Sequence, residues 1–297
     1  MNKIIDKGHM GKTIEFSSID DRINFLKDFN SKSIAIEKFE SWMYESKYNI
    51  LEFDFKSLII KNLIEKKIIS SDDFENHNND LEKLHLCMNL DDKNLDESEQ
   101  NNISISFYET TKELDNLYKK FIKNKISKIF SENIHYQIVP TFRFHFPNQK
   151  GYDWSDRYHT DIMLGHPPYE LNIWMPFTKV YGSNSMRLTP YKDSIDFIAD
   201  CDYDFEMFAK RTQYDEIFIK KLRNQSNPLE MNYGDYIIFD PRCLHCTQYN
   251  DTKDTRISMD IRIILEGYTE KYSRQYKTTG RKKMPFLPGH YFSKKAV

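Results

Sequence analysis

The spacing of apolar residues divides the chain into a helical first part and a β-rich second part. In 56–67 the apolar positions recur as they do along one side of a short amphipathic helix. Segment 109–130 has the same spacing, and its apolar side carries Leu114, Leu117, Phe121, Ile122 and Ile126. Between them, 71–102 is rich in Asp, Asn and Glu, which predicts a solvated loop. We therefore expect residues 1–130 to be mainly helical.

From about residue 135 the pattern changes to short β-like runs separated by Gly, Pro, Asn or Asp. The runs are 136–146, 157–163, 170–178, 184–190, 229–232, 235–240, 244–250 and 255–264. So many short strands favour an α+β fold with a double-stranded β-helix (jelly-roll) core rather than βαβ units. We expect one domain over 1–297, with the core at 131–268, a helical insertion at 191–228 and a C-terminal tail at 269–297.

Three of the runs alternate polar and apolar residues, so each has one polar and one apolar side. In 256–263 the polar side carries Arg256, Ser258, Asp260 and Arg262, and 141–146 and 170–177 follow the same rule. The polar sides either face water or line the inside of a barrel around a site. In the second case the apolar sides pack beneath the N-terminal helices.

Composition narrows the class of protein. The 297 residues carry a net charge of −2, so no basic surface for nucleic acid is expected. The N-terminus lacks the apolar run of a signal peptide, and no stretch has the length of a membrane span. These features predict a cytoplasmic protein that acts on a small molecule and binds neither nucleic acid nor a membrane. They leave its oligomeric state open.

The stretch YHTDIMLGH (158–166) places His159 two positions before Asp161. On a strand these side chains would point to the same side and offer an imidazole and a carboxylate to one metal ion. With 9 His and 45 acidic residues in the chain, roughly one such pair is expected by chance. Further residues must therefore supply the specificity. His245, in β-like context, and Arg256, eleven residues later, are the candidates.

The sequence Cys243-Leu-His-Cys246 raises the alternative of a zinc or redox motif. No second C-x-x-C pair accompanies it. Adjacent strand residues point to opposite sides, so Cys246 would face away from His245. The cysteines are therefore not expected to share a metal with this histidine.

Together, His159-x-Asp161, His245 and Arg256-x-Ser258 resemble the signature of the iron(II)/2-oxoglutarate-dependent dioxygenases. Segments PTFRFHFP, HTDIMLGHPPYELNIWMPFT, YGSNS and HCTQYNDTKDTRISMDIR are similar to the streptomycin-biosynthesis branch and, more distantly, to the phytanoyl-CoA dioxygenases. The resemblance covers roughly residues 130–265. It implies that the two histidines and Asp161 hold Fe(II) as a facial triad. It also implies that 2-oxoglutarate and dioxygen take the open positions, with Arg256 on the far carboxylate of 2-oxoglutarate.

Other candidates follow from position. Arg262 lies on the same side as Arg256 and is its rival, although the spacing from His245 favours Arg256. Ser258, Asn172 and Arg143 are further candidates for the cofactor pocket. Candidates for substrate contacts are Asp153, Trp154, His166, Glu170 and Trp174. Carboxylates beside an aromatic residue suit an amine-bearing metabolite, such as an amino acid or amino sugar.

The resemblance implies hydroxylation of an unactivated C–H bond of a small metabolite, with release of succinate and carbon dioxide. Desaturation, epoxidation and ring closure are known alternatives for such enzymes. Because Asp161 is retained, halogenation is not expected. A different class, a metal-binding cupin-type isomerase or sugar-binding module, would need no arginine for 2-oxoglutarate.

Overall fold

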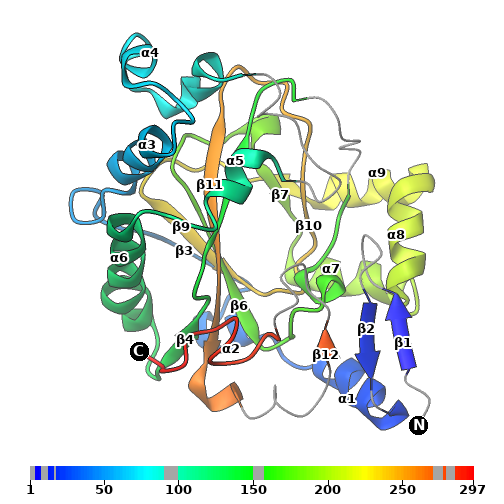
Figure 1. The fold of residues 1–297 in the computed structure, drawn as a ribbon. Helices are drawn as coiled ribbons and strands as arrows, with labels where there is room; N and C mark the ends of the chain where they lie inside the picture. The colour runs from blue at the N-terminus through cyan, green and yellow to red at the C-terminus, as the bar shows by residue number, and fades with distance from the viewer. Residues whose placement is uncertain are drawn as a thin grey trace.

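Antiparallel strands form the centre of the molecule. The computed structural model describes residues 4–7, 13–16, 18–89, 100–149, 157–269, 277–278 and 285–297. A six-stranded sheet has the order β3-β9-β6-β11-β4, and β5 also pairs with β11. Its strands are β3 Met43–Lys47, β4 Ile134–Tyr136, β5 Thr141–His145, β6 Glu170–Pro176, β9 Asp235–Phe239 and β11 Arg256–Leu265. This antiparallel sheet and the helices around it make the fold α+β, as expected (Figure 1).

Two small sheets complete the β structure. One has the order β10-β7-β8, from strands β7 Met186–Leu188, β8 Asn227–Pro228 and β10 His245–Thr247. The other, β1-β2-β12, is formed by β1 Ile4–Lys7, β2 Thr13–Phe16 and β12 Lys277–Thr278. Residues of the larger sheet and of β7 share one apolar cluster, so these two sheets pack on each other. The cluster contains Trp174, Ile237 and Phe239 from the large sheet and Met186 and Leu188 from β7.

Helices before residue 130 pack on the outside of the large sheet, apart from α1, which packs with the helical insertion. They are α1 Ile19–Phe29, α2 Ile34–Phe39, α3 Phe55–Glu65, α4 Ser71–Glu75, α5 Asn102–Ser106 and α6 Lys112–Phe121, with 3-10 helix η2 Leu81–Cys87. Helix α6 continues through the π-helical turn η4 Ile122–Ile126 into η5 Ser127–Ile129. Both helices expected from the apolar spacing, at 56–67 and 109–130, are therefore confirmed.

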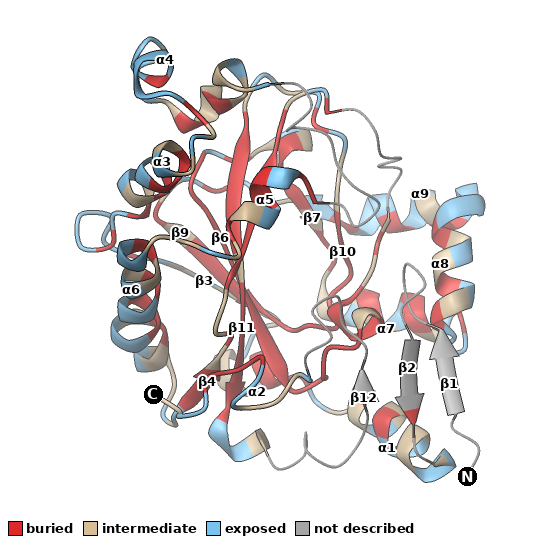
Figure 2. Cartoon of the chain, viewed as in Figure 1, coloured by how far each residue is buried: buried red, intermediate tan, exposed pale blue. Residues whose placement is uncertain are grey.

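The alternating strands place their apolar sides against these helices. Alternate residues of β6 and β11 join the main core, among them Ile173, Met175, Ile257 and Met259. Phe55 and Ile59 of α3 and Tyr118 and Phe121 of α6 belong to the same core. Figure 2 shows β6 and β11 buried and the outer sides of α3 and α6 exposed. Burial of each such side chain contributes about 1.5–3 kcal/mol. The polar sides therefore point away from these helices, as the sequence predicted for strands whose apolar sides pack beneath them.

The segment after β7 is helical, as expected for 191–228. It forms α7 Tyr191–Ala199, α8 Phe205–Tyr214 and α9 Glu216–Gln225. These helices pack with α1 and with Leu244 and Cys246 in a second apolar cluster. In Figure 1 they lie on the opposite side of the molecule from α3 and α6.

Three segments of the structure differ from what the sequence predicted. Segment 71–102 was expected to be a loop, but α4 and η2 occupy part of it because Phe74, Leu81 and Leu84 are buried in the main core. Strand β3 was missed, since its sequence MYESK lacks a run of β-forming residues. The stretch 285–297 is not a free tail: Phe292 is fully buried, and Ile134 and Val297 exchange backbone hydrogen bonds.

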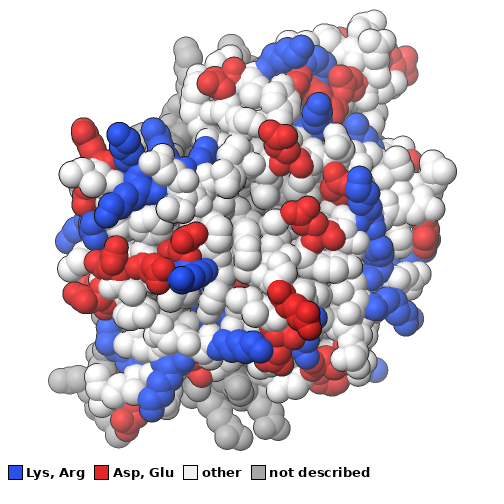
Figure 3. Space-filling view, turned by 180° about the vertical axis from the view of Figure 1, so that it is seen from behind, with Lys and Arg blue, Asp and Glu red and all other residues white. Residues whose placement is uncertain are grey.

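Surface charge is mixed on the face shown in Figure 3, where acidic and basic side chains alternate over short distances. This agrees with the net charge of −2. In the described part of the chain, none of the helices combines the length and apolarity that a bilayer crossing requires.

A buried ion pair ties α1 to the loop that leads into β10. The side chains of Asp240 and Arg242 are fully buried, with Arg242 Nε 2.7 Å from Asp240 Oδ1. Arg242 also donates through Nη1 to the carbonyl oxygens of Phe29 (2.8 Å) and Ser31 (2.9 Å), where α1 ends. The backbone N–H of Asp161 donates to the carbonyl of Pro241 in the same loop (3.1 Å). The pair thus supports the segment that presents the candidate ligands.

We expect Arg242→Met to lower the free energy of unfolding by about 3–5 kcal/mol, because Asp240 would be left as an unpaired buried charge. Urea unfolding measures the change. The double variant Asp240→Asn/Arg242→Met is the matched control and should recover part of the loss. An equal loss in both variants would contradict the role given to the charge pair.

Candidate metal centre

Three potential metal ligands meet beside the start of β10. His159 and His245 form an isolated antiparallel bridge, with backbone N–H···O distances of 3.0 and 2.9 Å. Asp161 begins the 3-10 helix η6 Asp161–Leu164. One ligand atom from each of the three residues lies within 4.8 Å of the others. Two imidazoles and one carboxylate at such distances suit a divalent metal with open coordination positions.

The route by which Asp161 reaches the histidines differs from the expected strand. Thr160 is extended, but the chain then turns, and Gly165 ends the turn with a φ of +89°. This left-handed conformation favours glycine. The side chains still converge because the bridge to His245 fixes His159, while the turn directs Asp161 toward the large sheet.

Both histidines are oriented for metal binding through Nε2. The Nδ1 atom of His245 lies 3.0 Å from the carbonyl oxygen of Cys243, and that of His159 lies 3.1 Å from the carbonyl oxygen of Arg157. A carbonyl can only accept, so Nδ1 carries the proton and donates in each ring. The Nε2 lone pairs are then directed elsewhere. Burial and the neighbouring His159 lower the pKa of His245 to about 4, so it is neutral at neutral pH.

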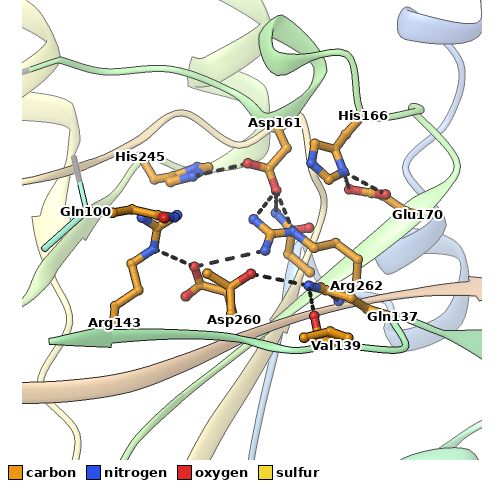
Figure 4. A network of polar contacts seen from close by, with 12 residues as sticks. Gln100, Gln137, Val139, Arg143, Asp161, His166, Glu170, His245, Asp260 and Arg262 are labelled. Carbon is orange, nitrogen blue, oxygen red and sulfur yellow. Dashed lines mark hydrogen bonds and ion pairs between the residues drawn. The ribbon is translucent and has the colours of Figure 1, made fainter. Parts of the chain in front are cut away.

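Asp161 is held by one of its two oxygens. Arg262 donates to Oδ2 through Nε (3.1 Å) and Nη2 (2.9 Å), and Asn172 Nδ2 donates to the same atom (2.8 Å; Figure 4). The buried Oδ1 accepts no hydrogen bond and lies 3.6 Å from His245 Nε2. Burial opposes the ionised form, yet Arg262 and the nearby histidines hold the pKa of this carboxyl well below its usual range. Asp161 is therefore a carboxylate with one free, directed oxygen.

Arg256 lies on the same side of β11 but has a different environment. Its Nη1 donates to the carbonyl of Asn184 (3.3 Å), while its buried Nε has no hydrogen-bond partner. Burial lowers the pKa of Arg256 to about 10, so it is still a cation at neutral pH. Ser258 is fully buried with an unpaired hydroxyl. This wall thus offers a buried cation and a buried hydroxyl to a polar ligand.

Unlike Arg256, Arg262 is paired with carboxylates. It pairs with Asp161, and its Nη1 lies 4.0 Å from Asp260 Oδ2. Arg143 Nε donates to that same oxygen (2.8 Å). Of the expected cofactor residues, Arg256 and Ser258 thus lie side by side on β11, whereas Asn172 supports the metal ligand and Arg143 is paired with Asp260.

The expected substrate residues are dispersed. Asp153 and Trp154 lie outside the described residues. His166 and the fully buried Glu170 contact each other, with Nδ1 2.9 Å from Oε1. Trp174 is 3% exposed and packs in the apolar cluster between the sheets. Burial leaves Glu170 and Trp174 little surface for a substrate.

The C-terminal segment contributes residues that were missed. The ring of Phe286 packs against His166 at an angle of 35° with centroids 4.0 Å apart, and Tyr291 lies 5.6 Å from the same ring. No spacing rule connects residue 286 with residue 166, so the sequence carried no local signal. The supporting role of Arg262 did have one, since it alternates with Arg256, Ser258 and Asp260 on β11.

The two cysteines around His245 lie in different cores. Cys243 packs in the cluster between the sheets, whereas Cys246 packs with the helical insertion. Within the described ranges, the His159–Asp161–His245 group is the one cluster found with metal-ligand geometry. The structure thus gives no support to a zinc site at these cysteines.

Comparison with curated proteins finds a similar protein from antibiotic biosynthesis. The chain is 24% identical to the streptomycin biosynthesis protein StrG of Streptomyces griseus over 187 residues, which are 63% of this chain and 72% of StrG. The expected resemblance is confirmed. No family model matches the chain.

Two of the solved structures that align with the chain have TM-scores below 0.5. EctD from S. alaskensis, solved with 2-oxoglutarate and 5-hydroxyectoine, has a TM-score of 0.49 and 11% identity over 86% of this chain and 78% of EctD. The α-ketoglutarate-dependent carbocyclase SnoK from nogalamycin biosynthesis has a TM-score of 0.46 and 11% identity over 80% of this chain and 85% of SnoK. At these scores, the assignment of function must come from the site itself.

We expect His159→Ala and His245→Ala to abolish tight binding of a divalent metal, since each removes one of three ligands. Cys243→Ser and Cys246→Ser are the matched controls and should retain it. Metal content after dialysis, with circular dichroism as a check of folding, measures the effect. Loss of metal in the cysteine variants alone would move the site to the C-x-x-C pair.

Proposed function

We propose that the protein is an iron(II)/2-oxoglutarate-dependent oxygenase that hydroxylates an unactivated C–H bond of a small metabolite. The observation that carries this proposal is Arg256, a buried cation without a carboxylate partner among the described residues. It lies on the strand that also anchors Asp161 through Arg262. A metal site and an unmatched buried arginine on one polar face suit a cosubstrate that binds iron at one end and carries a carboxylate at the other.

The residues fit Fe(II). His159, Asp161 and His245 offer two neutral nitrogens and one carboxylate oxygen, a donor set typical of non-haem iron oxygenases. The unpaired Oδ1 of buried Asp161 supports the same assignment, because such an atom is costly without a partner. Arg262 and Asn172 would keep Oδ2 engaged and so favour ligation through Oδ1 alone.

The residues also fit 2-oxoglutarate. Arg256 Nε and the Ser258 hydroxyl are both buried without hydrogen-bond partners. They could bind the terminal carboxylate, for which a guanidinium in a dry site is well suited. When bound, iron and 2-oxoglutarate would allow dioxygen to act as the oxidant, with one oxygen atom ending in succinate, which is released with carbon dioxide, and the other in the hydroxylated substrate. The chain's own share is to orient the cosubstrate and exclude water.

The fold we infer is a double-stranded β-helix. The large sheet and the β10-β7-β8 sheet pack through a shared apolar cluster, and His159 and His245 bridge beside the smaller sheet. This arrangement supports a jelly roll whose polar interior holds the metal. A cupin-type isomerase or sugar-binding module would share the metal ligands but would leave Arg256 without a function.

The test of the activity is formation of succinate from 2-oxoglutarate by the purified protein with Fe(II) and oxygen, screened against a metabolite library. We expect a subset of metabolites to raise succinate formation and to gain one oxygen atom by mass spectrometry. His245→Ala is the matched control and should form none. If no member raises succinate formation and the protein instead isomerises a metabolite, the cupin alternative is correct.

We expect Arg256→Lys to weaken 2-oxoglutarate binding by about 1.5–3 kcal/mol, because lysine cannot replace a guanidinium that bonds a carboxylate through two nitrogens. Calorimetric titration of 2-oxoglutarate into the Mn(II)-loaded protein measures it. Arg262→Lys should lower metal affinity instead, since Arg262 supports Asp161. A larger loss of 2-oxoglutarate affinity in Arg262→Lys, with metal binding intact, would reverse the two assignments.

A further inference from the structure

One ion pair on the polar side of the large sheet is partly exposed. All ten residues of β11 are buried except Asp260, and all five residues of β5 are buried except Arg143. These two side chains are 15% and 30% exposed, and they pair with each other. Strand β11 is covered by β6 on one side and by β4 and β5 on the other. The exposure is therefore on the polar, inward side of the strands, where a substrate could enter.

Arg143 has unused bonding capacity at this partly exposed position. Among the described residues, Arg143 hydrogen-bonds to one carboxylate, with its Nε donating to Asp260 Oδ2 (2.8 Å). A guanidinium has five N–H groups in one plane, so the two terminal nitrogens keep four for another acceptor. Because Asp260 fixes Nε, the guanidinium is oriented before a ligand arrives, which lowers the entropic cost of binding.

The charges of the interior leave one cation unmatched. Arg262 is balanced by Asp161 and Arg143 by Asp260. Fe(II) and the two carboxylates of 2-oxoglutarate would cancel each other, which leaves the charge of Arg256. These three arginines, their two partner carboxylates and both cofactors would thus carry one net positive charge in a region of low dielectric, where an anion is favoured. The buried Glu170 contacts His166 and is not part of this count.

We propose that the primary substrate carries a carboxylate and that the terminal nitrogens of Arg143 bind it. This inference rests on the proposed function, since it assumes that 2-oxoglutarate occupies Arg256. Asp260 connects Arg143 to Arg262, which in turn holds the metal ligand Asp161 (Figure 4). A substrate anchored at Arg143 therefore lies beside the metal ligands, with its anionic end fixed by a rigid chain of ion pairs.

Arg256 and Arg143 lie on the same side of the sheet but differ in exposure, which suits them to different ligands. Arg256 is buried and 3% exposed, which suits a cosubstrate that is enclosed during the reaction. Arg143 is accessible, which suits a substrate that must enter after the cosubstrate and leave as product. Arg143 is thus a specificity-determining residue, and Asp260 is its positioning residue.

The experiment uses acetate as a carboxylate probe and acetamide as its neutral isostere. Saturation-transfer NMR measures binding of each to the full-length protein loaded with Zn(II), a redox-silent substitute for iron, and saturating 2-oxoglutarate. We expect transfer to acetate and little to acetamide. In Arg143→Gln, acetate binding should fall about tenfold or more, the scale of a lost hydrogen bond to a charged group. Arg211→Gln, which removes a paired arginine on α8, is the matched control and should bind acetate as the wild type does.

Equal transfer to acetate and acetamide in the wild type would overturn the proposal, as would undiminished acetate binding in Arg143→Gln. If Arg143→Gln does not fold, Arg143→Lys replaces it and should bind acetate more weakly than the wild type, because its point charge cannot make the paired contact. If the protein fails to bind 2-oxoglutarate, the proposed function fails first. In that case, acetate binding without 2-oxoglutarate, compared between the wild type and Arg143→Gln, still decides the assignment of Arg143.

Discussion

The ion pair between Arg262 and Asp161 fixes the geometry of the interior. Arg262 comes from the central strand of the large sheet, whereas Asp161 comes from a turn that precedes β6 in the chain. Separation of the pair would leave either a carboxylate or a guanidinium uncompensated inside the protein, which costs several kcal/mol. The pair therefore locks the turn onto the sheet, and the free oxygen of Asp161 then faces the two histidines. The metal centre depends on this contact more than on the regularity of any strand.

The same constraint explains how polar side chains can line the inner face of the large sheet. Three arginines project inward from the large sheet, and each position requires an anion. Arg262 has Asp161 and Arg143 has Asp260, but Arg256 forms no ion pair with a carboxylate among the described residues, and Asp260 acts on it only from a distance. An incomplete set of counter-ions is unfavourable in a structural core but suits a site that binds an anionic cosubstrate. The apolar sides of the same strands, under α3 and α6, supply the stability that this interior lacks.

Much of this arrangement could be predicted from the sequence. The alternation in 256–263 placed Arg256, Ser258, Asp260 and Arg262 on one side, and the structure has them there. The convergence of His159, Asp161 and His245 was expected from their order and spacing, although a bridge and a turn bring them together rather than one strand. What could not be predicted depends on distant contacts. The packing of Phe286 against His166 joins residues 120 positions apart, and the sequence of β3 becomes a strand only because β9 offers it an edge.

Anaerobic titration of the Fe(II)-loaded protein with 2-oxoglutarate, followed by visible absorption, tests the central claim most directly. We expect a weak metal-to-ligand charge-transfer band that appears with 2-oxoglutarate and saturates at one equivalent per metal. The band should be absent in His245→Ala and should require higher 2-oxoglutarate concentrations in Arg256→Lys. A protein that binds Fe(II) through the same three residues but gives no such band at any 2-oxoglutarate concentration would contradict the account.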